Sequence, residues 1–167
     1  MLTQEKTQTF VYATYIRTTP EKLWEALTNG DFSEKYWMGF RIELEQKAGG
    51  RIRILPPKDG DQGKCGFHDG KVLACEPGRK LVYEFVIIDP PEVAQKRNGP
   101  SRVTYELKPM GEMVRLHLIH ENLLPEDMEK DPNATSRGIN NGWPPILSSL
   151  KSLLETGEAI HLKTGGQ

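Results

Sequence analysis

The chain has 167 residues, of which 37% are hydrophobic and 27% charged, a composition typical of one globular domain with its own core. Its 22 Lys and Arg nearly balance its 23 Asp and Glu, which argues against a nucleic acid or a membrane surface as the partner. No apolar run approaches the roughly 20 residues that span a bilayer, and the N-terminus lacks the basic-then-apolar order of a signal peptide. We therefore expect one cytoplasmic domain over residues 1–167, with its core within residues 10–156 and a disordered tail at 161–167.

The first part of the chain predicts a strand followed by two short helices. Alternating side chains favour a strand over residues 10–17. Thr19 is a typical helix cap and is followed by proline, which predicts a short helix after that strand. A second short helix is expected over residues 31–37, capped by Asp31 or Ser33.

The middle of the chain reads as a series of short strands separated by Gly- and Pro-rich turns. The predicted strands are residues 40–45, 50–55, 64–75, 79–88, 102–108 and 113–120. Links this short imply antiparallel neighbours, because parallel strands need long crossovers. Residues 89–100 are expected to form an exposed loop, and residues 124–133 lead to the last element.

The strongest pattern is an amphipathic helix near the C-terminus, over residues 146–156. Its apolar positions are Ile146, Leu147, Leu150, Leu153 and Leu154. Pro144 and Pro145 leave two possible beginnings: they occupy the first turn, or an earlier turn from about residue 136 is kinked there. We expect the Ile146, Leu147, Leu150 and Leu154 side to pack against the sheet, because only the sheet offers it a partner.

Several short motifs, in this order and spacing, carry a resemblance that covers about residues 10–156. They are Thr19-Pro20-Glu21-Lys22-Leu23-Trp24-Glu25-Ala26-Leu27-Thr28, Lys35-Tyr36-Trp37, Gly70-Lys71-Val72 before Glu76-Pro77, and Gly142-Trp143 with Leu150. The chain resembles stand-alone bacterial members of the activator of heat-shock protein 90 ATPase homology family, within the START-like, birch-pollen-allergen-like superfamily (SRPBCC). This resemblance implies an α+β helix-grip fold, in which a curved antiparallel sheet grips the C-terminal helix around an apolar cavity.

The resemblance leaves three functions open. Members of the superfamily include a eukaryotic co-chaperone module, polyketide cyclases and aromatases, and lipid carriers. The co-chaperone uses a separate N-terminal domain to grip its chaperone, and 167 residues leave no room for one. We expect a non-catalytic carrier or sensor that binds a small hydrophobic molecule. A chaperone-associated interaction module and a cyclase-like or aromatase-like enzyme are the alternatives.

Aromatic residues on the predicted inward faces are the best functional signal. They form either plain core or the wall of a cavity in which Tyr hydroxyls and Trp ring nitrogens orient a ligand. The expected ligand-binding residues are Trp37, Phe40, Tyr83, Phe85, Tyr105, His120, Trp143 and Leu147.

His120 is the one residue of that set that can exchange a proton near neutral pH. It shares a strand face with Leu118, so we expect it to point inward. A hydrogen-bonded histidine at the cavity rim is favoured over a ligand anchor or a general base, because no second catalytic group is fixed nearby in sequence. Cys65 and Cys75 are expected to be reduced thiols, and together with His68 they lack metal-ligand spacing, so no metal or cofactor is expected.

Overall fold

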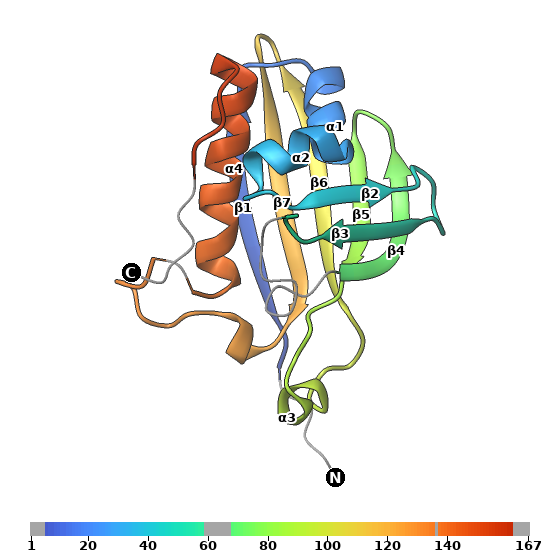
Figure 1. Ribbon diagram of the computed structural model, residues 1–167, viewed down its shortest axis with the longest axis vertical. Coiled ribbons are helices and arrows are strands. Elements are labelled where there is room, and N and C mark those ends of the chain that lie inside the picture. The colour runs from blue at the N-terminus through green and yellow to red at the C-terminus, as the bar shows by residue number, and fades with distance from the viewer. Residues whose placement is uncertain (1–5, 59–67, 136, 162–167) are drawn as a thin grey trace.

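The computed structural model describes residues 6–58, 68–135 and 137–161, and within them seven strands form one curved antiparallel sheet (Figure 1). The strands are β1 (Gln8–Ile16), β2 (Arg41–Leu44), β3 (Arg51–Leu55), β4 (His68–Glu76), β5 (Lys80–Phe85), β6 (Ser101–Met110) and β7 (Met113–Leu123). Their order across the sheet is β1-β7-β6-β5-β4-β3-β2. Apart from the step from β1 to β7, every neighbour in space is also a neighbour in sequence, so the predicted antiparallel series is confirmed.

Two short helices, α1 (Pro20–Thr28) and α2 (Gly30–Tyr36), follow β1 and cover the sheet on the side of the C-terminal helix (Figure 1). Thr19 caps α1 as predicted, since its hydroxyl accepts a hydrogen bond from the backbone N–H of Lys22. The predicted cap of α2 is wrong. Asn29 ends α1 and also caps α2, because its side-chain oxygen accepts from the backbone N–H of Asp31 at 2.9 Å.

The long helix α4 (Ile139–Thr156) lies along β1 and contacts both short helices, which gives the predicted helix-grip fold (Figure 1). Its buried side chains are Trp143, Ile146, Leu147, Ser149, Leu150 and Leu153. One residue of the predicted face is misplaced, since Leu153 is buried and Leu154 is only half-buried.

The start of α4 is the earlier of the two predicted alternatives, because Pro144 and Pro145 lie inside the helix. Each proline lacks a backbone N–H and so removes one intrahelical hydrogen bond. The first turn is held from outside instead. The side chain of Asn140 accepts a hydrogen bond from the backbone N–H of Glu129 and donates one to its carbonyl, at 2.9 and 3.0 Å.

The two connections at one end of the sheet are more structured than predicted. The predicted loop 89–100 contains a short helix, α3 (Pro91–Ala94), with proline at its first position. A 3-10 turn, η1 (Pro125–Asp127), follows β7 at the same end of the molecule (Figure 1). Strand β5 also ends at Phe85, three residues before its predicted end.

Of the two cysteines expected to be reduced thiols, the structure describes one. Cys75 is a free thiol on β4, whereas Cys65 and tail residues 162–167 lie outside the described residues. Burial raises the pKa of the Cys75 thiol. No helix in the described part of the chain is long and apolar enough to cross a membrane.

Candidate functional site

Seven of the eight residues expected to bind a ligand belong to or pack against one hydrophobic core between the sheet and the helices, and His120 is a buried polar residue beside it. Trp37 follows α2, Phe40 precedes β2, Tyr83 and Phe85 lie on β5, Tyr105 on β6, His120 on β7, and Trp143 and Leu147 on α4. Phe40 and Phe85 are half-buried, whereas the other six residues are at most 6% exposed. Their ligand-binding role stays a prediction.

Trp143 is the centre of the ring contacts in this core. Its indole lies 5.3 Å from the Trp37 ring, 6.0 Å from the Phe85 ring and 6.3 Å from the Tyr105 ring, measured between centroids. The rings of His120 and Phe85 are in edge-to-face contact, with their centroids 5.0 Å apart. We call the group that these contacts join the aromatic cluster. It consists of Trp37, Tyr83, Phe85, Tyr105, His120 and Trp143.

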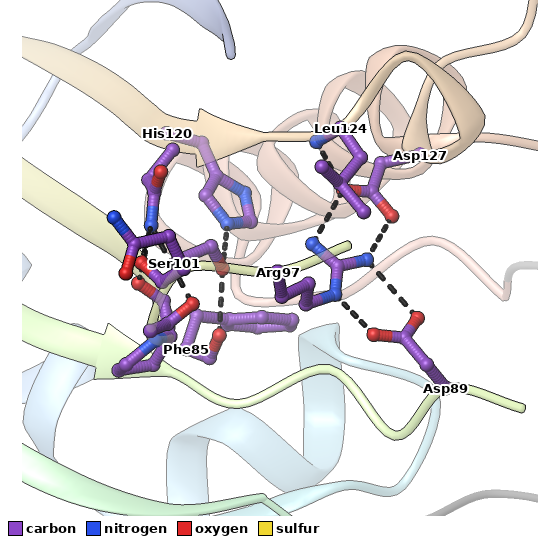
Figure 2. Close-up of polar contacts among 11 residues, drawn as sticks. Phe85, Asp89, Arg97, Ser101, His120, Leu124 and Asp127 are labelled. Atoms are coloured by element: carbon purple, nitrogen blue, oxygen red, sulfur yellow. Dashed lines mark hydrogen bonds and ion pairs between the residues drawn. The ribbon is translucent and has the colours of Figure 1, made fainter. Parts of the chain in front are cut away.

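The imidazole of His120 lies within a chain of hydrogen bonds that crosses three strands and α4. The Trp143 Nε1–H donates to His120 Nδ1 at 3.0 Å. His120 Nε2 lies 2.8 Å from Ser101 Oγ, whose own proton is donated to the carbonyl of Phe85 at 2.6 Å (Figure 2). Because an indole nitrogen can only donate, His120 Nδ1 must be the acceptor and Nε2 must carry the hydrogen.

This geometry corrects two expectations about the site. His120 points inward and is hydrogen-bonded as predicted, but it is 0% exposed and therefore does not lie at a rim. The ring nitrogen of Trp143 is used inside the protein by His120, so it is not available to orient a ligand in this conformation. The sequence could not show this, because the indole covers His120 from α4, 23 residues away.

The tautomer of His120 can be measured directly. We expect nitrogen-15 NMR at neutral pH to show a neutral imidazole with the hydrogen on Nε2, since the Trp143 N–H occupies Nδ1. Trp143→Phe removes that donor and should change the Nδ1 signal, whereas Trp24→Phe, whose indole donates to Gln46, should not. A hydrogen on Nδ1 in the wild-type protein would contradict the hydrogen-bond chain.

Three tyrosine hydroxyls are buried beside the aromatic cluster. Tyr36, Tyr83 and Tyr105 are each at most 2% exposed, and the hydroxyls of Tyr83 and Tyr105 lie 3.2 Å apart. Burial raises the pKa of all three phenols, and their mutual electrostatic repulsion when ionised raises it further. All three are therefore neutral hydrogen-bond donors at physiological pH. Tyr36 was not among the predicted site residues, although it stands in the Lys35-Tyr36-Trp37 motif.

A buried ion cluster joins the two structured connections beside the His120 end of the sheet (Figure 2). The guanidinium of Arg97 forms paired contacts with the carboxylates of Asp89 and Asp127, and the three side chains are only 7–10% exposed. Asp127 also accepts from the backbone N–H of Leu124 at 2.7 Å. Burial by itself lowers the pKa of the Arg97 guanidinium, but the hydrogen bonds to Asp89 and Asp127 outweigh it and leave the pKa raised. The Arg97 cluster therefore ties the chain between β5 and β6 to the chain after β7.

A shallow groove of about 540 Å³ lies outside the aromatic cluster, between α1, α2 and β2. Its lining is largely polar and includes Glu21, Glu25 and Arg41, and none of the eight predicted residues is part of it. Within residues 6–58, 68–135 and 137–161, no three His, Cys, Asp or Glu side chains are arranged to hold a metal ion.

Solved structures with the same architecture come from several bacteria. Protein MLL2253 from Mesorhizobium loti is 28% identical, covers 88% of this chain and 96% of its own, and superimposes with a TM-score of 0.66. The Aha1 dimer from Colwellia psychrerythraea is 22% identical, with 91% and 99% of the two chains covered and a TM-score of 0.66. DynU16, a putative protein in the dynemicin biosynthetic locus, is 18% identical over 90% of this chain and 48% of its own, with a TM-score of 0.64.

A search of curated proteins finds no match, but a comparison with family sequence models does. The sequence model of one family, described as "Activator of Hsp90 ATPase homolog 1-like protein", matches residues 17–155 and thus spans α1 to the last turn of α4. The chain therefore belongs to the family of Activator of Hsp90 ATPase homolog 1-like proteins.

Proposed function

We propose that the protein binds a small apolar molecule, aromatic or acyl, between the sheet and α4, and acts as its carrier or sensor. The observation that supports this most is the composition of the aromatic cluster. It runs from the half-buried ring of Phe85 to the buried hydroxyls of Tyr83 and Tyr105. Apolar walls with a few placed polar groups are typical of small-molecule sites.

Binding is favoured over catalysis by the state of His120. Both of its ring nitrogens are engaged, one with Trp143 and one with Ser101. A general base needs a nitrogen that is free to accept a proton from the substrate. A cyclase-like or aromatase-like activity would therefore require this hydrogen-bond chain to open first. Such an activity is the alternative that the likeness to DynU16, from the dynemicin biosynthetic locus, suggests.

A surface role with a chaperone is the other alternative, since the family description names the Hsp90 ATPase. We expect the protein to act as one cytoplasmic domain, and ligand binding needs no second domain. A silent ligand screen combined with capture of a chaperone and stimulation of its ATPase would favour this alternative over ours.

A thermal-shift screen with fatty acids, flavonoids and naphthalene derivatives tests the proposed function. A ligand that binds only the folded state stabilises it by about 2.7 kcal/mol at a hundredfold excess over its dissociation constant, so hits should raise the melting temperature. Phe85→Leu removes one ring of the aromatic cluster and should weaken the hits. Tyr15→Leu, on a side chain that is 44% exposed, is the control and should leave them unchanged. Equal binding by both variants would place the ligand elsewhere, against the proposal.

A further inference from the structure

The hydroxyl of Tyr36 is buried without a hydrogen-bond partner among the described residues. Tyr36 is the last residue of α2 and is 1% exposed. Its neighbour Trp37 packs on Trp143, which fixes the end of the helix against the aromatic cluster. Leaving a buried donor unsatisfied is costly, so a native protein that keeps one usually has a reason for it.

Tyr83 and Tyr105 add a second unused donor. Their two hydroxyls lie 3.2 Å apart and share one hydrogen bond, whichever of them donates. With Tyr36, the three hydroxyls therefore carry three protons, and only one of these protons has an acceptor among the described residues. Ring contacts place the three tyrosines in one part of the core. Trp37, next to Tyr36 in the chain, packs on Trp143, which packs on Tyr105, and the Tyr105 ring lies 5.8 Å from the Tyr83 ring. Consistent with this placement, electrostatic repulsion from Tyr105 adds to the raised pKa of Tyr36, and repulsion from Tyr36 adds to the raised pKa of Tyr83.

The chemistry of these groups specifies what they would bind. A neutral phenol can both donate and accept a hydrogen bond, but two of these three protons lack an acceptor in the described part of the chain, so the group that they are missing is an oxygen that can accept two hydrogen bonds. Among the described residues near the cluster, the buried cation Arg97 is already paired with Asp89 and Asp127. A buried carboxylate would thus lack a counter-charge, whereas a neutral carbonyl needs none.

We propose that Tyr36, together with the Tyr83–Tyr105 pair, binds the carbonyl oxygen of an apolar ligand and so selects ketones, esters or lactones over hydrocarbons of the same shape. This inference rests on the proposed function, because the carbonyl belongs to the ligand that the aromatic cluster surrounds. The tyrosines are then recognition residues, and the free protein holds their unused donors ready for the ligand.

The first test needs no ligand. Tyr36→Phe removes a hydroxyl that has no partner, so its urea midpoint should equal or exceed that of the wild-type protein. The matched control is Ser101→Ala, which deletes a buried hydroxyl that makes two hydrogen bonds and should lower the midpoint. A lower midpoint for Tyr36→Phe would show that its hydroxyl is already satisfied in the free protein, and would overturn the inference.

The second test compares two probes of nearly equal shape, 2-acetylnaphthalene and 2-isopropenylnaphthalene, which differ by a carbonyl oxygen in place of a methylene group. Relative to the wild-type protein, Tyr36→Phe should shift the ratio of the two dissociation constants about 3- to 10-fold in favour of the hydrocarbon. This shift corresponds to the loss of one hydrogen bond. Tyr15→Phe, on the exposed side of β1, should leave the ratio unchanged. The infrared carbonyl stretch of the bound ketone should lie at lower frequency in the wild-type protein than in Tyr36→Phe.

The outcomes separate this inference from the proposed function. If both probes bind and their ratio is the same in the wild-type protein and Tyr36→Phe, the carbonyl assignment is wrong while the apolar site stands. If neither probe binds at saturating concentration, the inference and the proposed site are both contradicted.

Discussion

Replacing Arg97 with Met should lower the free energy of unfolding by about 3–5 kcal/mol, the cost of removing one partner from a buried ion pair. The substitution keeps much of the apolar stem but leaves the carboxylates of Asp89 and Asp127, only 8% and 7% exposed, without their cation. Urea unfolding at neutral pH, followed by circular dichroism, measures the loss.

The matched control for this prediction is Arg102→Met. Arg102 pairs with Glu121 on the sheet surface, with side chains 49% and 35% exposed, so its loss should cost less than about 1 kcal/mol. Equal effects of the two substitutions would mean that the Arg97 cluster is solvated and does not hold the connections around α3 and η1 together.

Leu150→Ala should lower the free energy of unfolding by about 2–5 kcal/mol, the usual range for a truncated core leucine. Leu150 lies in the middle of the buried face of α4 and is 0% exposed. Its removal leaves a cavity where the sheet grips the helix, and the packed surroundings can close only part of it. The same urea titration measures this change.

Leu73→Ala is the control for the helix. Leu73 lies on β4 and is 43% exposed, so its truncation should change stability by no more than about 0.5 kcal/mol. A loss for Leu150→Ala as small as this would show that α4 is not gripped by the sheet.

The strands and the C-terminal helix could be predicted because burial imposes a period on the sequence. Alternation in β5, β6 and β7 follows from one face packing on the core. The four strand residues of the aromatic cluster could be named for the same reason, since inward positions of a half-buried strand follow from its register. They are Tyr83, Phe85, Tyr105 and His120.

Other features depend on partners far away in sequence, which no local pattern contains. The start of α4 could not be chosen because Pro144 and Pro145 oppose a helix locally, whereas Asn140 anchors the first turn on Glu129. The Arg97 cluster joins segments 30 residues apart in connections without periodicity. Whether the Tyr36 hydroxyl has a partner depends on how α2 is placed over the sheet.

The side-chain N–H signals of the tryptophans test the central claim, binding between the sheet and α4, most directly. The chain has 3 Trp, and their indole signals in a nitrogen-15 NMR spectrum can be assigned by single Trp→Phe substitutions. Trp37 and Trp143 lie in the aromatic cluster, whereas the Trp24 indole donates to Gln46 beside the outer groove. On titration with 2-acetylnaphthalene, the account predicts that the Trp37 and Trp143 signals shift to saturation while the Trp24 signal stays in place. A shift of Trp24 alone, or no shift of any of the three at saturating ligand, would contradict it.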